Sequence, residues 1–150
     1  LAVGIIFALV LSAGLSLFYP DLVLTTELLS RTSVGIDGLA LALASGAAAA
    51  LSITTGVSSV LVGVMVAVAL LPPTVTLGIC LGIGAYPEAK GAAFLLIANI
   101  ASVNLTAQLT MRLKGIKPRE EEHQRTALIV FIIGILCWCA LIAYLIYRLN

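Results

Sequence analysis

Two adjacent prolines, Pro72 and Pro73, interrupt a long apolar stretch of this 150-residue sequence. Proline has no N–H, so these two residues leave the carbonyls of Val68 and Ala69 without helical partners. Pro72 also disfavours the α conformation at Leu71. In hydrocarbon an unsatisfied backbone group costs several kcal/mol, so it is tolerated only against protein or a water-filled cavity. The prolines therefore predict a helix that breaks at Leu71.

The predicted break separates two half-helices, about residues 57–71 and 73–85, inside one membrane segment. The carbonyl end of one and the amide end of the other would meet near mid-membrane, so a pole that favours cations would lie beside one that favours anions. Thr74 and Thr76 add hydroxyl groups at this point. A binding site for a small solute or ion explains these residues, and so does a proline kink that only shapes the bundle.

Polar side chains are frequent in the next apolar stretch, about residues 88–111. At helical spacing, one face carries Asn99, Ser102, Thr106 and Thr110, while Asn104 and Gln108 lie on roughly the opposite face. Such residues usually face the interior of a bundle or a cavity. Asn99 and Asn104 are therefore candidates to line a solute or ion pathway, with hydrogen bonds between helices as the alternative. For the serine and the threonines, hydrogen bonds between helices are the expected role, with a pathway as the alternative.

Asp37 is the acidic residue nearest to membrane depth. It fits a first-turn carboxylate at the membrane interface, or else an ion or proton site. The lone histidine, His123, lies among charged residues of a loop, and no second histidine completes a ligand set. The cysteines, Cys80, Cys137 and Cys139, fall in apolar segments and are interpreted as packing residues. We therefore expect no metal and no cofactor.

Composition indicates a membrane protein. Hydrophobic residues make up 61% of the chain and charged residues 10%, and the mean hydropathy is +1.18, whereas soluble proteins have about 25% charged residues. The net charge of +1 leaves no basic stripe to neutralise phosphates, which excludes nucleic acid as a partner. Membrane lipid is the expected surrounding.

The apolar runs predict an all-α, polytopic transmembrane helical bundle that forms a single domain over residues 1–150. Residues 21–33, which are mixed in charge, predict a short interfacial helix or loop, with Asp21 as its N-cap. The chain begins in an apolar run without methionine, so we expect it to be a fragment of a longer protein. We expect about five spans, one of them broken at the two prolines, at about residues 1–19, 34–54, 57–85, 88–111 and 126–147.

Small residues recur at spacings of three and four, which lets helices approach closely in lipid. We expect these positions to pack helices together within the bundle and between copies of the chain, as a homo-oligomer. The packing positions are Gly38, Ala42, Ser45 and Ala49 in the second span, Gly63 with Ala67 before the prolines, and Gly78 with Gly82 after them.

Basic residues set the expected orientation. Five of the eight Lys and Arg residues lie in the loop 112–125, and the positive-inside rule places such a loop in the cytoplasm. That assignment requires each span to cross once.

The sequence contains the stretches SRTSVGIDGLALALASGAAAALS, GVMVAVALLPPTVTLGICLG and GAAFLLIANIASVNLTAQLTMRLKGIKP. These stretches are similar to the membrane family called domain of unknown function 389. The resemblance extends over about residues 1–118, and its acidic and asparagine positions correspond to Asp37 and Asn99. Members also carry an earlier proline-containing span that this chain lacks. The resemblance implies an integral protein of a prokaryotic plasma membrane and implies no activity.

Two functions remain after these exclusions. The first is a transporter or channel-like protein for a small solute or ion, with its site at the double proline. The second is a non-transporting oligomeric scaffold or signalling anchor. An enzyme is not expected: Asp37 with Gly38, Ala42 and Gly46 superficially resembles phosphatidyl-transferases, but these require further acidic residues that the span lacks.

Overall fold

The computed structural model describes residues 2–19, 22–116 and 121–149, and every regular element in them is an α-helix. The predicted all-α class is therefore confirmed. The six helices of the described residues are α1 (Ala2–Phe18), α2 (Thr26–Ser30), α3 (Ile36–Thr54), α4 (Ser59–Gly82), α5 (Tyr86–Leu113) and α6 (Glu121–Leu149).

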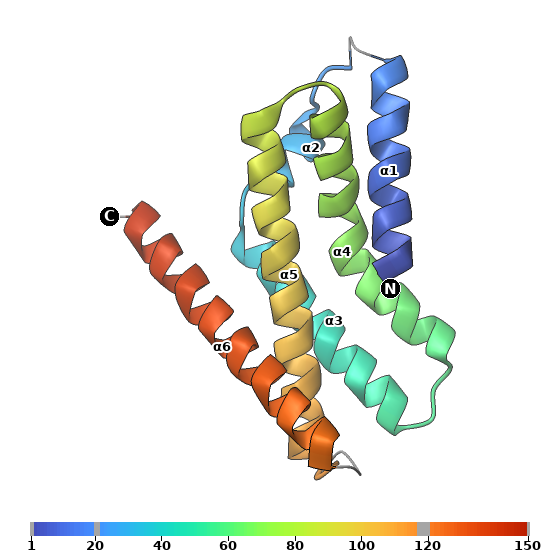
Figure 1. Ribbon diagram of the computed structural model, residues 1–150, viewed down its shortest axis with the longest axis vertical. Helices are drawn as coiled ribbons and strands as arrows, with labels where there is room; N and C mark the ends of the chain where they lie inside the picture. Colours follow the sequence, from blue (N-terminus) through green and yellow to red (C-terminus); the bar gives the residue numbers. More distant parts are fainter. Residues whose placement is uncertain (1, 20–21, 117–120, 150) are drawn as a thin grey trace.

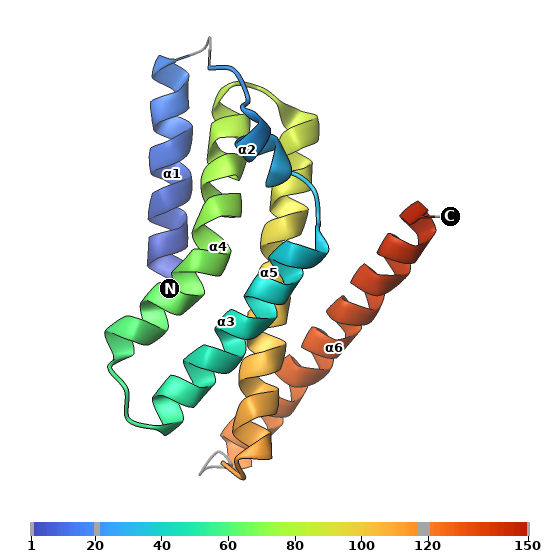
Figure 2. The ribbon, with the colours of Figure 1, turned by 180° about the vertical axis from the view of Figure 1, so that it is seen from behind.

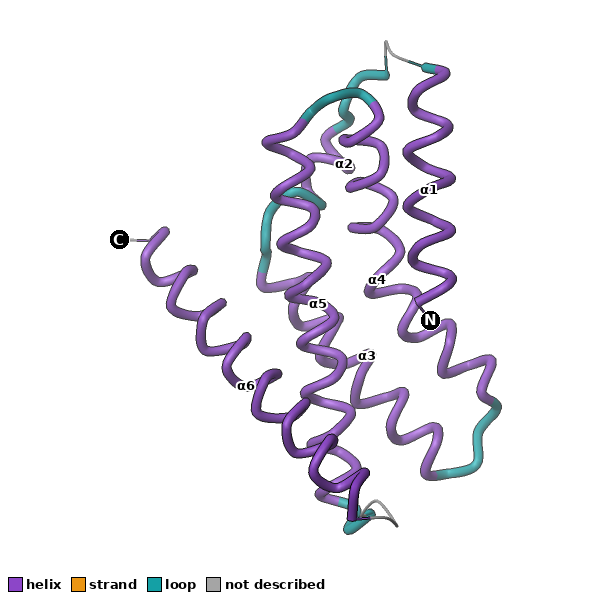
Figure 3. The backbone as a smooth tube through the Cα atoms, in the orientation of Figure 1, coloured by secondary structure: helices purple, strands orange, loops and turns teal. Residues whose placement is uncertain are grey.

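The long helices form a bundle in which α4 and α5 are central (Figure 1). Helix α1 packs on α4, α3 packs on both α4 and α5, and α6 packs on α5. Seen from either side, α6 approaches α5 at its N-terminal end and diverges towards its C-terminus (Figure 2). The connection from α3 to α4 lies at one end of the bundle and that from α4 to α5 at the other, and residues 31–35, between α2 and α3, run along its side (Figure 3). Helices α1, α4 and α6 therefore run in one direction, and α3 and α5 run in the other.

By length and composition, three of the described helices are long and apolar enough to cross a membrane: Ile36–Thr54, Val60–Gly82 and Tyr86–Leu113. The apolar helix Ala2–Phe18 is shorter, with 17 residues. The chain thus has the helices of a membrane protein. The count of five spans stays a prediction.

Helices α3 and α4 end in the same way. Gly56 and Gly84 follow them with φ values of 74° and 76°, a conformation that glycine adopts without strain. The next residue then donates its N–H back into the last turn, from Val57 to the Ser52 carbonyl and from Ala85 to the Cys80 carbonyl. This arrangement pairs carbonyls that a helix end leaves free.

Helix α4 differs from its predicted form. It forms one helix from Ser59 to Gly82 with Pro72 and Pro73 inside it, and its path bends between the two ends (Figures 1 and 2). The prediction of two separate half-helices is therefore not supported. The prolines remove two N–H donors from the helix, and side chains replace part of that loss, so the helix bends without opening.

The glycines after the prolines hold α1 against α4. A Cβ built on Gly78 would collide with Ser12 Oγ and lie 2.7 Å from the Leu9 carbonyl oxygen, and one on Gly82 would collide with Ser16 Oγ. Both serines are buried. The packing predicted for these glycines is present, and Ser12 and Ser16, four residues apart, are the matching positions on α1.

The small residues of α3 also face neighbouring helices, because Ala42, Ser45 and Ala49 are all buried. The closest approach is at Gly46, where a Cβ would lie 2.8 Å from Val103 Cα of α5. Gly38 makes a looser contact, with Leu95 Cδ1 3.9 Å from the position of an added Cβ. The stripe expected from the sequence therefore packs α3 within the chain.

The segment between α1 and α3 forms a short helix, α2, as one of the two expected alternatives. Its N-cap is Thr25, whose hydroxyl accepts a hydrogen bond from the Leu28 N–H at 3.4 Å. The predicted N-cap, Asp21, lies outside the described residues. At the other end of the bundle, the Arg112 guanidinium lies 4.0 Å from the centre of the Phe131 ring and joins α5 to α6.

Candidate functional site

The bend of α4 is held by a side chain from α5. Pro73 carries no N–H for the Ala69 carbonyl, and Asn99 Nδ2 donates a hydrogen bond to that oxygen at 2.8 Å. On the adjacent Leu70 carbonyl, the Thr74 hydroxyl donates at 2.7 Å. Of the two carbonyls that the prolines free, the one of Ala69 thus receives a side-chain hydrogen bond in place of the missing N–H.

The contact with Ala69 determines how the Asn99 amide is oriented. A carbonyl oxygen can only accept, so the amide must turn its nitrogen towards Ala69. The other atom, Asn99 Oδ1, is then buried with no hydrogen-bond partner among the described residues. Trp138 Nε1 of α6 is also buried and unpartnered in that part of the chain. Unpaired buried polar atoms are rare, so Asn99 Oδ1 marks the bend as a candidate site.

The site lies deep in the bundle. Asn99 is 4% exposed and Thr74 is fully buried. Pro73 and Thr76, which lie close to Thr74 in α4, are also buried, and Pro72 is partly buried. Asn99 also falls near the middle of α5, Tyr86–Leu113, which puts it about 20 Å from each end at 1.5 Å per residue. The structure therefore brings four of the predicted site residues to the centre of the bundle.

The other hydroxyl groups on this face of α5 bond within their own helix. Ser102 donates to the Ala98 carbonyl at 2.7 Å, and Thr106 and Thr110 donate to carbonyls one turn earlier. Such bonds satisfy the hydroxyl protons locally. Among the described residues these side chains form no hydrogen bonds between helices, which the sequence predicted as their role.

Two further candidates lie apart from this cluster. Asn104 is exposed on α5, and Asp37 is exposed in the first turn of α3. The Asp37 carboxylate folds against Gly35, the N-cap residue, where an added Cβ would lie 2.6 Å from Asp37 Oδ1. A first-turn carboxylate near free N–H groups is a favourable arrangement without any ligand.

No metal-binding group is present where side chains are described: no three His, Cys, Asp or Glu residues lie together there. Cys80 is buried and Cys139 is exposed, and neither is in a disulfide. The side chains of His123 and Cys137 lie outside the described part of the chain.

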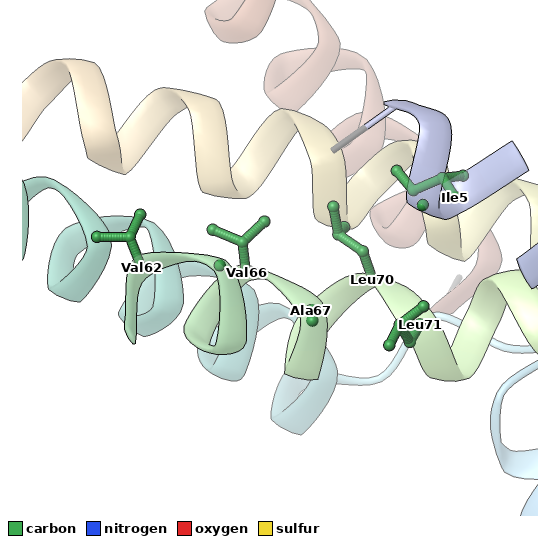
Figure 4. A pocket seen from close by; sticks show the side chains of 8 residues that line it. Ile5, Val62, Val66, Ala67, Leu70 and Leu71 are labelled. Carbon is green, nitrogen blue, oxygen red and sulfur yellow. The ribbon is translucent and has the colours of Figure 1, made fainter. Parts of the chain in front are cut away.

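A groove runs along the N-terminal half of α4, next to the first turn of α1 (Figure 4). It has a volume of about 500 Å³ and an apolar lining that includes Ile5, Val66 and Leu70. Gly63 and Ala67 also line it, and no atom lies within 4 Å of a Cβ built on Gly63. Unlike Gly78 and Gly82, this pair of small residues has no helix packed on it among the described residues.

The chain resembles other proteins whose function is not known. A family model described as "Domain of unknown function (DUF389)" matches residues 1–105. An uncharacterised protein of Methanocaldococcus jannaschii is 29% identical over 148 residues, which cover 96% of this chain and 46% of that relative. This chain thus spans about half the length of the curated relative. No solved structure matches it significantly.

Proposed function

Because the chain belongs to the DUF389 family, whose description assigns no activity, we propose a function from the geometry of the bend. The protein is proposed to be a transporter or channel-like protein that passes a small solute or ion at Pro72 and Pro73. The observation that carries the proposal is the buried Asn99 side chain, which pairs with the Ala69 carbonyl and whose Oδ1 has no partner among the described residues.

One feature supports a pathway over a kink that only shapes the bundle. A kink requires the freed carbonyl to be satisfied, and the Asn99 nitrogen does that. It does not require a second polar atom without a partner, which costs free energy when buried. Polar groups at membrane depth that packing alone does not explain are characteristic of solute and ion pathways.

Replacing both Pro72 and Pro73 with alanine tests the proposal. The variant restores N–H donors to the Val68 and Ala69 carbonyls, so α4 should straighten and Asn99 should lose its partner. We expect flux of the transported species into liposomes to be abolished, while the full-length protein still assembles. Flux should be measured over a panel of ions and small solutes, with assembly followed by gel filtration.

The matched control is Pro87→Ala, because Pro87 lies in the first turn of α5, where a helix tolerates proline. It should leave flux unchanged. Full flux through an assembled Pro72→Ala, Pro73→Ala variant would contradict the proposed pathway.

A second candidate function is an oligomeric membrane scaffold or signalling anchor, and the open groove at Gly63 and Ala67 favours it. Gly78 and Gly82 have the same spacing of four and receive α1. By this comparison within one helix, the groove would receive a helix of a second copy of the chain.

Cross-linking separates the scaffold from a monomer. Ala67→Cys should form cross-linked dimers in native membranes, because the groove would place this residue at the contact. Leu81→Cys, at an exposed position of the same helix away from the groove, should not. Equal cross-linking at both positions, or none at Ala67→Cys, would remove the scaffold contact proposed here.

The proposal includes a location and no enzymatic step. We place the chain in a prokaryotic plasma membrane with the loop 112–125 in the cytoplasm. Arg112 lies at the C-terminal end of α5, whereas Lys90 lies near its N-terminal end and Arg31 follows α2. The five Lys and Arg residues of the loop 112–125 are the reason for this orientation, by the positive-inside rule. Residues 117–120 of the loop lie outside the described residues.

A further inference from the structure

The polar groups at the bend offer a ligand mainly oxygen lone pairs and few free hydrogen-bond donors. Pro72 and Pro73 supply no N–H. The Thr74 hydroxyl proton is committed to the Leu70 carbonyl, and the Ser102 proton, one turn from Asn99, is committed to the Ala98 carbonyl. What these groups can still offer a ligand is the lone pairs of their oxygens, together with Asn99 Oδ1.

A ligand of such a site must be a cation or a hydrogen-bond donor, because lone pairs repel an anion. The site is also neutral: Thr74, Thr76, Asn99 and Ser102 carry no charge. Divalent cations are bound mainly by carboxylates, and the cost of taking an ion out of water rises steeply with its charge. Neutral carbonyl and amide oxygens instead replace the hydration shell of monovalent ions.

We infer that the bend of α4 binds a monovalent alkali-metal cation, with Asn99 Oδ1 as one of its ligands. This inference rests on the proposed function, because it names the class of ion that the same site accepts. Asn99 then has two roles: its nitrogen holds the Ala69 carbonyl, and its oxygen faces the ion. One side chain thereby couples the shape of the helix to occupation of the site.

Two other partners compete for Asn99 Oδ1. One is Trp138 Nε1, the other unpaired buried group of the described residues, since Trp138 packs against the cluster of Leu39 and Ala98, and Ala98 precedes Asn99 in α5. The other is a water molecule, which would satisfy the oxygen without selecting an ion. The experiment must separate a cation from both.

Thermal unfolding of the full-length protein in lipid nanodiscs provides the test. NaCl, KCl, choline chloride and CaCl₂ are compared at equal ionic strength. A cation that binds only the folded state raises the midpoint, by about 3 °C or more for each tenfold rise in concentration above its dissociation constant. We expect this rise with Na⁺ or K⁺ and none with choline or Ca²⁺.

Variants locate the effect. Asn99→Leu should lose the response, and Asn99→Asp, which keeps a ligand oxygen but no longer donates to the Ala69 carbonyl, should be less stable and still respond. Asn104→Leu and Trp138→Phe should respond as the wild type does. Equal midpoints in all salts, a full response in Asn99→Leu, or loss of the response in Trp138→Phe would overturn the inference.

The two proposals fail differently. If the cation response is present but no ion crosses liposomes under any gradient, the binding site stands and transport fails. If a neutral solute crosses equally well in NaCl and choline chloride, transport stands and the cation site fails.

Discussion

Replacing Asn99 with leucine should lower the free energy of unfolding by about 1–3 kcal/mol and abolish flux, although the two side chains have the same number of heavy atoms and the same branching. The reason is the Ala69 carbonyl, which accepts from Asn99 Nδ2 at 2.8 Å and is buried. Without that donor, a buried acceptor is left unpaired at the cost of its desolvation. Reversible unfolding by sodium dodecyl sulfate in mixed micelles measures the stability, and liposome flux measures the activity.

The matched control is Asn104→Leu. Asn104 lies on the same helix, but it is exposed, so we expect a change in stability within about 0.5 kcal/mol and normal flux. If the two variants lose the same amount, burial at the bend is not what gives Asn99 its importance.

Gly78→Leu should separate α1 from α4 and prevent normal assembly. A Cβ at Gly78 already meets Ser12 Oγ and the Leu9 carbonyl oxygen at 2.7 Å, and the backbone atom cannot move unless α1 moves. We expect a loss of stability of about 3 kcal/mol or more, as overpacking against backbone is among the costlier substitutions. Yield of the monodisperse protein and protease accessibility of α1 measure the effect.

Gly63→Leu makes the same change in the same helix where space is open. It should change the stability of a single chain little or increase it slightly, because leucine also favours a helix over glycine. An equal loss of stability in both leucine variants would show that these glycines are needed for the backbone conformation of α4 and not for the approach of α1.

The helices were predictable because crossing a membrane requires long apolar runs, and the sequence shows them directly. The span predicted at about residues 88–111, for example, appears as Tyr86–Leu113. The number of membrane crossings was not predictable, because it depends on which of the apolar helices insert into the lipid. Helix α1, with 17 residues, is short for a crossing on length alone.

The bend of α4 could not be predicted from the local sequence around the prolines. The sequence correctly identified the carbonyl of Ala69 as freed, and from that fact alone a broken helix follows. Its partner comes from Asn99, 30 residues further along the chain and on another helix. A contact of that separation is decided by packing of α4 on α5, so the sequence pattern predicted a break where the structure has a bend.

The two asparagines of α5 could not be ranked from the sequence. Asn99 and Asn104 each lie on a polar face of the same predicted helix, and only the position of α4 buries one and exposes the other. Ser12 and Ser16 were missed, although their spacing of four is visible. A serine in an apolar run indicates close packing of two helices only when the residue facing it on the other helix is known to be glycine.

A double-mutant cycle between Asn99 and Pro73 tests the central claim, that the Asn99 side chain replaces the N–H that Pro73 lacks. Pro73→Ala returns an N–H to the Ala69 carbonyl, so in that background Asn99→Leu should cost at least about 1 kcal/mol less than in the wild type. An equal cost of Asn99→Leu in both backgrounds, within about 0.3 kcal/mol, would contradict the account.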